Sequence, residues 1–176
     1  MPDNAPLARR IYDIARITGD FTLRSGAKST EYFDKYLFET DPKLLKQIAS
    51  AMVGLVPPHL DALAGLEMGG IPIATMLSQL TGLPVLFVRK KAKNYGTCKI
   101  AEGGRVRGRK LLIVEDVVTA GGAILDAAKA LRAEGSELGA AVCVIDRESG
   151  GPANLAKSDL ILTSLFTMSE LKKAGA

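Results

Sequence analysis

The sequence predicts an α/β fold, in which a parallel sheet is flanked by helices and preceded by a small N-terminal flap. Two observations carry this prediction. From residue 62 onward, short apolar runs alternate with segments of helical periodicity, the pattern of a parallel sheet covered on both faces. Residues 21–36 fall outside that alternation and are expected to form the flap. A length of 176 residues suits one domain, with the flap at about 1–40 and the α/β core at about 41–176.

The elements before residue 60 are predicted from periodicity and capping residues. Residues 7–17 have helical periodicity, and Gly19 is expected to end that helix. Residues 21–36 are predicted to hold two short strands that lie over the carboxyl edge of the sheet. Asp41-Pro42 is typical of a helix N-cap followed by the first helical position, so a helix is expected from there to about residue 56.

From residue 62 the predicted elements alternate along the chain. The expected strands are apolar runs at 62–66, 85–88, from 111 onward, 140–145 and 160–166. The expected helices are 71–80, 120–134 and a short one opened by residues 167–170, which resemble a capping box.

The segment Leu111–Ala123 is the most informative part of the sequence. Its apolar run leads into Glu115 and Asp116, which are expected at the carboxyl end of a buried strand, where open α/β sheets bind their ligands. Thr119 and the Gly121-Gly122 pair then lie where backbone amides and a helix N-terminus can hold a phosphate. Because carboxylates repel phosphate, the acidic pair is expected to face ribose hydroxyls or a divalent cation. The segment therefore indicates a sugar phosphate ligand.

Basic residues are concentrated in one stretch. The chain has 23 basic and 19 acidic residues and a net charge of +4. Residues 89–110 hold nine of the basic residues and one acid, Glu102, so that stretch carries +8 and the remainder −4. This concentration favours a small polyphosphate ligand. The competing interpretation is nucleic acid binding, but the stretch offers one aromatic residue, Tyr95, for base stacking, and no nucleic acid is expected as a partner.

Four further segments are candidates for the site, and each has a structural alternative. Glu67–Gly70 offers glycine amides to an anion, or is a tight strand–helix turn. Residues 89–108 are expected to form a lid over a charged substrate, or a solvated basic loop. Arg147 is suited to gripping a carboxylate or carbonyl pair, or is held between its two acidic neighbours. Tyr32-Phe33 is a wall for a planar ring, or an anchor of the flap.

Composition limits the compartment and the chemistry. The N-terminus lacks the apolar stretch of a signal peptide, and no run of about 18 apolar residues exists, so a cytoplasmic protein without membrane contact is expected. Cys98 and Cys143 have no metal-type or redox-type spacing, which predicts reduced thiols. His59 is the only histidine and lies between two expected elements, so no histidine general acid or base is expected.

Leu111–Ala123 strongly resembles the 5-phosphoribosyl 1-diphosphate (PRPP) motif of the type I phosphoribosyltransferases. The flap and the basic loop narrow the resemblance to the orotate phosphoribosyltransferases within that family. The segments that carry it are residues 21–26 and 32–34 for the flap, 69–72 for the pyrophosphate-side loop, 89–96 for the start of the catalytic loop, and 146–147 for the base-recognition turn.

The resemblance implies a reaction, a cofactor and an assembly. The 5-phosphoribosyl group of PRPP would pass to N1 of orotate, giving orotidine 5′-monophosphate and pyrophosphate in pyrimidine biosynthesis. Mg²⁺ is the implied cofactor, held mainly through PRPP and water and not directly by the protein. A homodimer is implied, in which loop 89–108 acts on the site of the neighbouring subunit.

The resemblance also implies roles for individual residues. Lys93 and Asp116 would be catalytic, with Lys93 neutralising the leaving pyrophosphate. Orotate would be held by Tyr32, Phe33, Thr119 and Arg147. PRPP would be bound by Arg24, Arg89, Lys90, Lys93, Tyr95, Glu115, Asp116, Val117, Val118, Thr119, Ala120, Gly121, Gly122 and Ala123.

Three residues depart from the family pattern, and two other functions stay open. Tyr95 stands where many members have His, Gly69 where some have Lys, and Ala123 where a hydroxyl is frequent. The first alternative function is a phosphoribosyltransferase acting on another base such as a purine. The second is a non-catalytic PRPP-sensing regulator. Arg147 and the flap favour orotate, which carries a carboxylate that purines lack, and Lys93 favours an enzyme.

Overall fold

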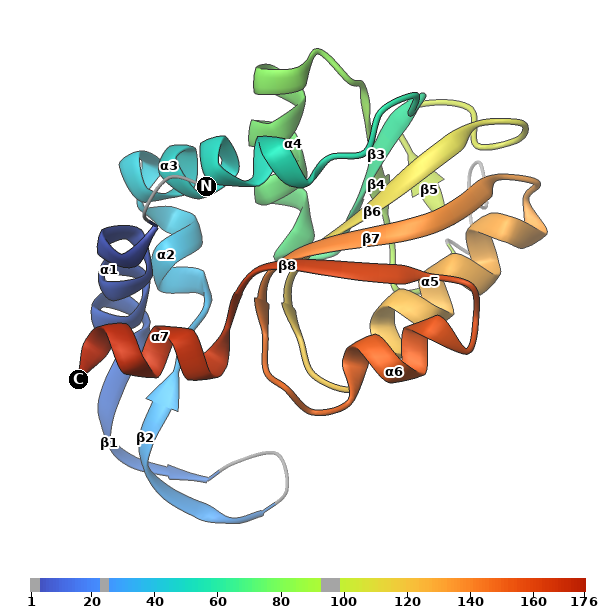
Figure 1. Cartoon of the computed structure of the whole chain (residues 1–176). Coiled ribbons are helices and arrows are strands. Elements are labelled where there is room, and N and C mark those ends of the chain that lie inside the picture. Colours follow the sequence, from blue (N-terminus) through green and yellow to red (C-terminus); the bar gives the residue numbers. More distant parts are fainter. Residues whose placement is uncertain (1–3, 23–25, 93–98) are drawn as a thin grey trace.

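The computed structural model describes residues 4–22, 26–92 and 99–176, and a six-stranded sheet forms its centre (Figure 1). In sheet order the strands are β5 (Ala101–Glu102), β4 (Val85–Val88), β3 (Ala62–Leu66), β6 (Lys110–Val118), β7 (Glu137–Asp146) and β8 (Ile161–Thr167). All neighbouring strands are parallel except β5, which runs antiparallel to β4 at the edge. The predicted α/β fold with a mostly parallel sheet is confirmed.

Helices cover both faces of the sheet (Figure 1). On one face lie α3 (Pro42–Met52) and α4 (Gly70–Thr81), and on the other lie α5 (Gly122–Ala133) and α6 (Gly151–Ala156). Each face of the sheet has its own hydrophobic core, and alternate residues of a strand point into one or the other. Leu112 and Val114 pack on the α3–α4 side, and Leu111 and Ile113 pack on the α5 side. None of the helices within the described ranges is long and apolar enough to cross a membrane.

The N-terminal flap is a hairpin with short helices. Its elements are α1 (Ala5–Ala15), β1 (Arg16–Thr22), β2 (Lys28–Phe33) and α2 (Tyr36–Thr40). The two strands pair antiparallel, with Ile17 opposite Tyr32, and form a sheet of their own. The C-terminal helix α7 (Met168–Gly175) lies beside α1, where a Cβ on Gly175 would come within 2.0 Å of the Tyr12 ring.

Two capping predictions are confirmed at the sequence positions that suggested them. The Asp41 carboxylate accepts hydrogen bonds from the N–H groups of Lys43 and Leu44, both at 2.9 Å, at the start of α3. Thr167 and Glu170 form a reciprocal capping box at the start of α7. Both motifs depend only on residues within one helical turn, which is why sequence reasoning reaches them.

The first predicted helix boundary was wrong, and three short elements were not predicted. Helix α1 ends at Ala15, and Gly19 lies inside β1, because Ile17 and Thr18 pair with β2 instead of extending the helix. The 3₁₀ turn η1 (Val53–Leu55) continues α3 and lies within the helix predicted to about residue 56. The elements without a sequence prediction are α2, β5 and α6. Each has six residues or fewer, too short for periodicity to separate from a loop.

Candidate functional site

The turn between β6 and α5 presents backbone amides at a helix N-terminus. We call residues 119–123 the β6–α5 turn. Gly121 precedes α5 with a φ of 83°, a left-handed conformation that glycine adopts without strain. In the part of the chain that the structure describes, no side-chain hydrogen bond caps the first turn of α5, and four of the five residues of the turn are exposed. Uncapped amides at the positive end of the helix dipole are suited to binding a phosphate.

The same turn is supported from behind by α6. A Cβ on Gly151 would come within 2.7 Å of the Thr119 carbonyl oxygen, so α6 approaches the turn as closely as glycine allows. The Asn154 side-chain amide donates a hydrogen bond of 3.1 Å to the carbonyl oxygen of Ala120. The carbonyl side of the β6–α5 turn is therefore fixed by an element that the sequence did not predict.

The two predicted carboxylates lie in β6, close to its carboxyl end, and both are buried. Glu115 is 7% exposed and Asp116 0%. The Asp116 N–H donates to Glu115 Oε1 at 3.0 Å, and the Val117 N–H donates to Asp116 Oδ1. Burial raises the pKa of Glu115 well above its ordinary value. Both carboxyl groups are thus oriented by backbone amides of their own strand.

A lysine from the flap forms an ion pair with Asp116. Lys35 Nζ lies 2.6 Å from Asp116 Oδ2, and its side chain is 33% exposed. Burial opposes the charge of the ammonium, but the Asp116 carboxylate outweighs this effect and keeps the pKa of Lys35 above its usual value. Lys35 is therefore cationic at neutral pH and neutralises the buried Asp116.

Glu39 of α2 completes what we call the carboxylate cluster: Lys35, Glu39, Glu115 and Asp116. A Cβ on Gly69 would come within 1.6 Å of Asp116 Oδ2 and 2.8 Å of Glu39 Oε1, so the two oxygens flank one point. Two ionised carboxylates at that point would repel each other, and neither would supply a hydrogen-bond donor. Burial and the neighbouring Asp116 raise the pKa of Glu39 to about 9. Glu39 is therefore protonated at neutral pH and donates to Asp116.

The Glu67–Gly70 turn between β3 and α4 contacts the same cluster. Gly69 leaves the space that the Asp116 carboxylate occupies, and a Cβ on Gly70 would come within 2.3 Å of the Val114 carbonyl oxygen. The Glu67 carboxylate accepts a hydrogen bond of 2.6 Å from the Lys90 N–H and so ties this turn to the end of β4. The Glu67–Met68 peptide bond is cis. Both glycines are required by close packing, which was the structural alternative for this segment.

Three of the four residues predicted to hold orotate line one cavity of about 220 Å³, which we call the flap cavity. Tyr32 and Phe33 come from β2, and Arg147 follows β7. Tyr32 also contacts the Phe21 ring, with 5.6 Å between ring centroids. Thr119 does not line the flap cavity, but the Arg147 N–H donates to the Val118 carbonyl oxygen at 2.8 Å, next to Thr119.

The acidic neighbours of Arg147 have other partners. Asp146 Oδ1 accepts a hydrogen bond of 2.9 Å from the Glu148 N–H. The Glu148 carboxylate accepts a hydrogen bond of 2.8 Å from the Ser169 N–H at the start of α7. No ion pair joins Arg147 to either neighbour within the described residues. The guanidinium is therefore available to a ligand in the flap cavity.

The basic stretch does not form one continuous surface. Arg89 forms an ion pair with Glu102 of β5, with 3.5 Å between Nε and Oε1. Arg109 donates to the Asp61 carbonyl oxygen at 2.6 Å at the amino edge of the sheet. The return of the chain through β5 therefore carries the second half of the stretch away from the carboxyl edge. Within the described residues, the basic side chains predicted to bind one ligand are therefore divided between the two edges of the sheet, with Arg89 at one and Arg109 at the other.

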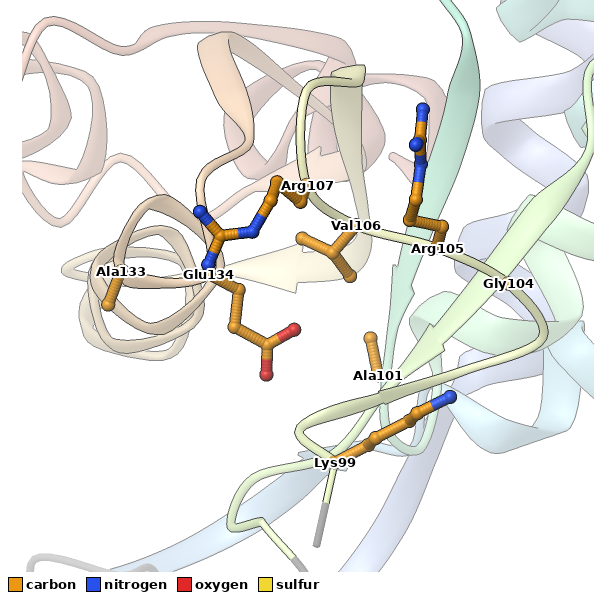
Figure 2. A pocket seen from close by; sticks show the side chains of 8 residues that line it. All are labelled: Lys99, Ala101, Gly104, Arg105, Val106, Arg107, Ala133 and Glu134. Atoms are coloured by element: carbon orange, nitrogen blue, oxygen red, sulfur yellow. The ribbon is translucent and has the colours of Figure 1, made fainter. Parts of the chain in front are cut away.

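A second hollow, which we call the basic hollow, lies between the segment around β5 and the C-terminal end of α5 (Figure 2). Its volume is about 460 Å³, and its lining includes Lys99, Arg105, Arg107 and Glu134. Figure 2 shows that the three cationic side chains diverge and do not point at a common centre. Among the described residues that line it, the basic hollow therefore presents no converging set of cations to an anion.

Arg24, Lys93 and Tyr95, predicted to bind PRPP, lie outside the described residues. Within the described residues, no group of three or more His, Cys, Asp or Glu side chains could hold a metal ion.

Sequence reasoning missed Lys35 and Glu39 at the carboxylate cluster, and Arg16 and Lys172 at the flap cavity. The one available signal was the position of Lys35 directly after the Tyr32–Asp34 segment, which was already assigned to the flap.

Comparisons with known proteins agree with this arrangement. The phosphoribosyl transferase domain family matches residues 39–164. A Nocardioides protein named orotate phosphoribosyltransferase is 56% identical over 176 residues, covering 98% of each chain. An orotate phosphoribosyltransferase from Mycobacterium tuberculosis, solved with Fe(III) dicitrate, superposes with a TM-score of 0.87 at 29% identity, covering 97% of this chain and 99% of the other.

The same Mycobacterium tuberculosis enzyme has also been solved with PRPP. That structure has a TM-score of 0.83 and 26% identity to this chain, and covers 97% of this chain and 99% of the other. From the family match, the identity and the fold together, this chain belongs to the orotate phosphoribosyltransferase family, within the phosphoribosyl transferase domain proteins.

Proposed function

We propose that this protein catalyses transfer of the 5-phosphoribosyl group from PRPP to N1 of orotate, giving orotidine 5′-monophosphate and pyrophosphate. The observation that carries the proposal is the meeting of three features at the carboxyl edge of the sheet. These are the amides at the start of α5 in the β6–α5 turn, the carboxylate pair of β6, and the flap cavity with Arg147, which forms no ion pair with any described residue. The 56% identity to an orotate phosphoribosyltransferase supports the choice of base.

The geometry suggests which segments of the protein would bind the phosphate, the ribose and the pyrophosphate of PRPP. The β6–α5 turn, residues 119–123, would wrap the 5′-phosphate with backbone N–H groups, because its amides are exposed and its carbonyls face α6. Glu115 and Asp116 would accept hydrogen bonds from the ribose hydroxyls, each carboxyl group being oriented by the N–H of the residue that follows it in β6. Arg89 and Lys90 would hold pyrophosphate oxygens from the end of β4.

The orotate site would be the flap cavity. Arg147 has the fork of donors that matches a carboxylate or a pair of carbonyl oxygens. Tyr32, which is 46% exposed, and Phe33 would stack on the planar ring, and Thr119 would reach it from the β6–α5 turn. A purine has no carboxylate for Arg147 to bind. We therefore propose orotate, and not a purine, as the base.

Catalysis would depend on charge placed before the reaction begins. The transition state has oxocarbenium character, and negative charge develops on the departing pyrophosphate. Proton transfer contributes little, so fixed cations and amides supply the stabilisation. Lys93, Arg24 and Tyr95 are assigned to PRPP by the resemblance, with Lys93 neutralising the leaving group. A chain that keeps Lys93 is suited to catalysis and not only to sensing PRPP.

Magnesium fits this site as a companion of the substrate. The carboxylates that could bind it, Glu115 and Asp116, are buried and oriented by strand amides, and Asp116 is already paired with Lys35. Mg²⁺ would therefore be held by PRPP oxygens and water, and would screen the charge of the pyrophosphate. We propose a cytoplasmic location for the enzyme, in keeping with its place in pyrimidine biosynthesis.

The decisive assay is the absorbance change of orotate on mixing with PRPP, Mg²⁺ and the purified protein. We expect loss of orotate that requires Mg²⁺ and that collapses in Lys93→Ala. The matched control, Lys46→Ala, removes an exposed lysine from α3 and should keep wild-type activity. Binding of PRPP without turnover of orotate would overturn the assignment and direct the search to purine bases or a sensor.

The proposed dimer, in which loop 89–108 serves the neighbouring site, has its own test. Lys93→Ala and Asp116→Ala subunits are each expected to be inactive. Because random exchange places one intact site in each mixed dimer, the mixture should recover about one quarter of wild-type activity. Recovery would require both a dimer and a loop acting across it, and a mixture as inactive as its parents would exclude that arrangement.

A further inference from the structure

The contact between Lys35 and Asp116 joins two parts of the molecule that are far apart in sequence. Lys35 directly precedes α2 in the flap, and Asp116 lies in the central strand β6. The ammonium is 2.6 Å from Asp116 Oδ2, and the Asp116 side chain is 0% exposed. Lys35 thus lies over the carboxylate that the proposed function assigns to the ribose.

The two carboxylate oxygens of Asp116 already have contacts that limit further hydrogen bonding. Oδ1 accepts the N–H of Val117, and Oδ2 lies against Lys35 and beside Gly69. A ribose hydroxyl that donates to Oδ2 must therefore share this oxygen with the ammonium or displace it. Lysine is suited to such an exchange because its charge is a single compact group on a flexible stem.

The position of Lys35 also favours the substrate as its new partner. Gly69 opens the turn before α4 on the side of the site assigned to pyrophosphate, and its missing Cβ would come within 1.6 Å of the oxygen that Lys35 contacts. With PRPP bound as the proposed function has it, an ammonium at this point would lie between the ribose side and the pyrophosphate side of the substrate. Moving from a buried carboxylate to a polyanion keeps the cation paired throughout.

Glu39 does not compete for the ammonium. Its carboxyl group is protonated at neutral pH, because burial and Asp116 raise its pKa, and it supplies a donor to Asp116. When Lys35 leaves, Asp116 therefore retains one donor and does not become an isolated buried charge.

Resting on the proposed function, we propose that Lys35 is a PRPP-binding residue that is the counterion of Asp116 in this structure and passes to the substrate when PRPP binds. Its ammonium contacts an oxygen on the ribose or pyrophosphate side of PRPP, and Asp116 is released to accept from the ribose. The flap thereby contributes a cation to the PRPP site, in addition to its part in the orotate site.

The test compares Lys35→Met with Lys46→Met. Methionine keeps the length and apolar stem of lysine and removes the ammonium, and Lys46 is an exposed lysine of α3 outside both sites. Calorimetry with Mg²⁺ and PRPP is expected to show at least tenfold weaker binding for Lys35→Met and no change for Lys46→Met. KM for PRPP should rise in parallel, while KM for orotate changes less than about twofold.

Lys35→Gln covers the case in which Lys35→Met does not fold. The glutamine amide can still donate to Asp116, so the buried carboxylate keeps a partner, but no positive charge reaches PRPP. We expect PRPP affinity to fall about fivefold or more in this variant as well. A loss confined to kcat or thermal stability, with unchanged or tighter PRPP binding, would show that Lys35 is only a structural counterion.

The outcome also separates this inference from the proposed function. If wild-type protein binds PRPP and consumes orotate while Lys35→Met and Lys35→Gln bind PRPP as tightly, only the inference fails. If wild-type protein binds PRPP without using orotate, the calorimetry still decides the role of Lys35. If wild-type protein does not bind PRPP, both fail.

Discussion

The β6–α5 turn and the carboxylate cluster lie at the same edge of the sheet but are built in opposite ways. The turn offers backbone N–H groups from five consecutive, mostly exposed residues. The cluster offers side chains from two segments far apart in sequence, and its three carboxyl groups are 7% exposed or less. In the proposed binding mode, the turn would receive the 5′-phosphate without rearrangement, whereas the cluster would first exchange its partners. The difference predicts that substitutions act differently in the two places.

The largest expected effect is that of Gly69→Ala, which acts on the cluster without removing a charge. The added Cβ would lie 1.6 Å from Asp116 Oδ2, so the carboxylate must move. A displacement of about 1 Å in a catalytic group can cost on the order of 100-fold in rate, and we expect a loss of kcat/KM for PRPP of that order. Gly54→Ala is the control, because its Cβ meets nothing within 4 Å. Equal activity of the two variants would mean that Asp116 has no fixed role.

Arg147→Ala compares the flap cavity with the basic hollow. Removing a charged hydrogen-bond partner of orotate should raise KM for orotate by about 10- to 100-fold and leave PRPP binding nearly unchanged. Arg105→Ala, in the basic hollow of Figure 2, should leave both constants unchanged, because its side chain points away from a common centre. A rise in KM for orotate in Arg105→Ala would move the base site away from the flap.

Ala123→Ser tests the β6–α5 turn by addition. The new hydroxyl would lie in the first turn of α5, where the exposed position leaves room for it to donate to the 5′-phosphate. We expect about threefold tighter PRPP binding in calorimetry, since the backbone amides already supply most of the contact. The matched change at the far end of the helix, Ala133→Ser, should have no effect. Weaker binding in Ala123→Ser would indicate that the phosphate lies elsewhere.

The smallest effect on activity is expected for Glu39→Gln. Glutamine resembles a protonated glutamic acid and can donate to Asp116, so kcat/KM at neutral pH should stay within about threefold of wild type. Its consequence lies in the pH dependence of stability. Glu39 is buried beside Lys35, Glu115 and Asp116. Burial and the neighbouring Asp116 raise its pKa from an ordinary value of 4.5 to about 9. The folded protein therefore binds this proton more tightly than the unfolded chain.

The sign of that dependence follows from linkage. The contribution of Glu39 is complete below about pH 4.5 and is lost as the pH rises through about 9. Thermal denaturation should show a decline in stability between pH 6 and pH 9 that is shallower in Glu39→Gln. Glu115, with its raised pKa, leaves a residual slope. Glu137→Gln at an exposed position should keep the wild-type slope, and an unaltered slope in Glu39→Gln would mean that Glu39 is already ionised.

The contrast between the turn and the cluster also explains which parts of the fold and the site could be predicted from the sequence. Leu111–Ala123 encodes a strand, a turn and a helix start in contiguous residues, so its local pattern was sufficient. The caps at Asp41 and Thr167 were predicted for the same reason. Gly19 was misassigned because the pairing of β1 with β2 outweighed the local preference to end a helix. Lys35 and Glu39 contact Asp116 only after α2 packs over β6, and no local pattern records that contact.

One competition experiment tests the central claim most directly. The protein is incubated with PRPP, Mg²⁺ and equal amounts of orotate, uracil, adenine and hypoxanthine, and the nucleotides formed are identified by mass spectrometry. We predict that orotidine 5′-monophosphate forms with an equal amount of pyrophosphate, and that the other three bases remain unused. Formation of a purine nucleotide, or hydrolysis of PRPP without any nucleotide, would contradict the assignment of the flap cavity to orotate.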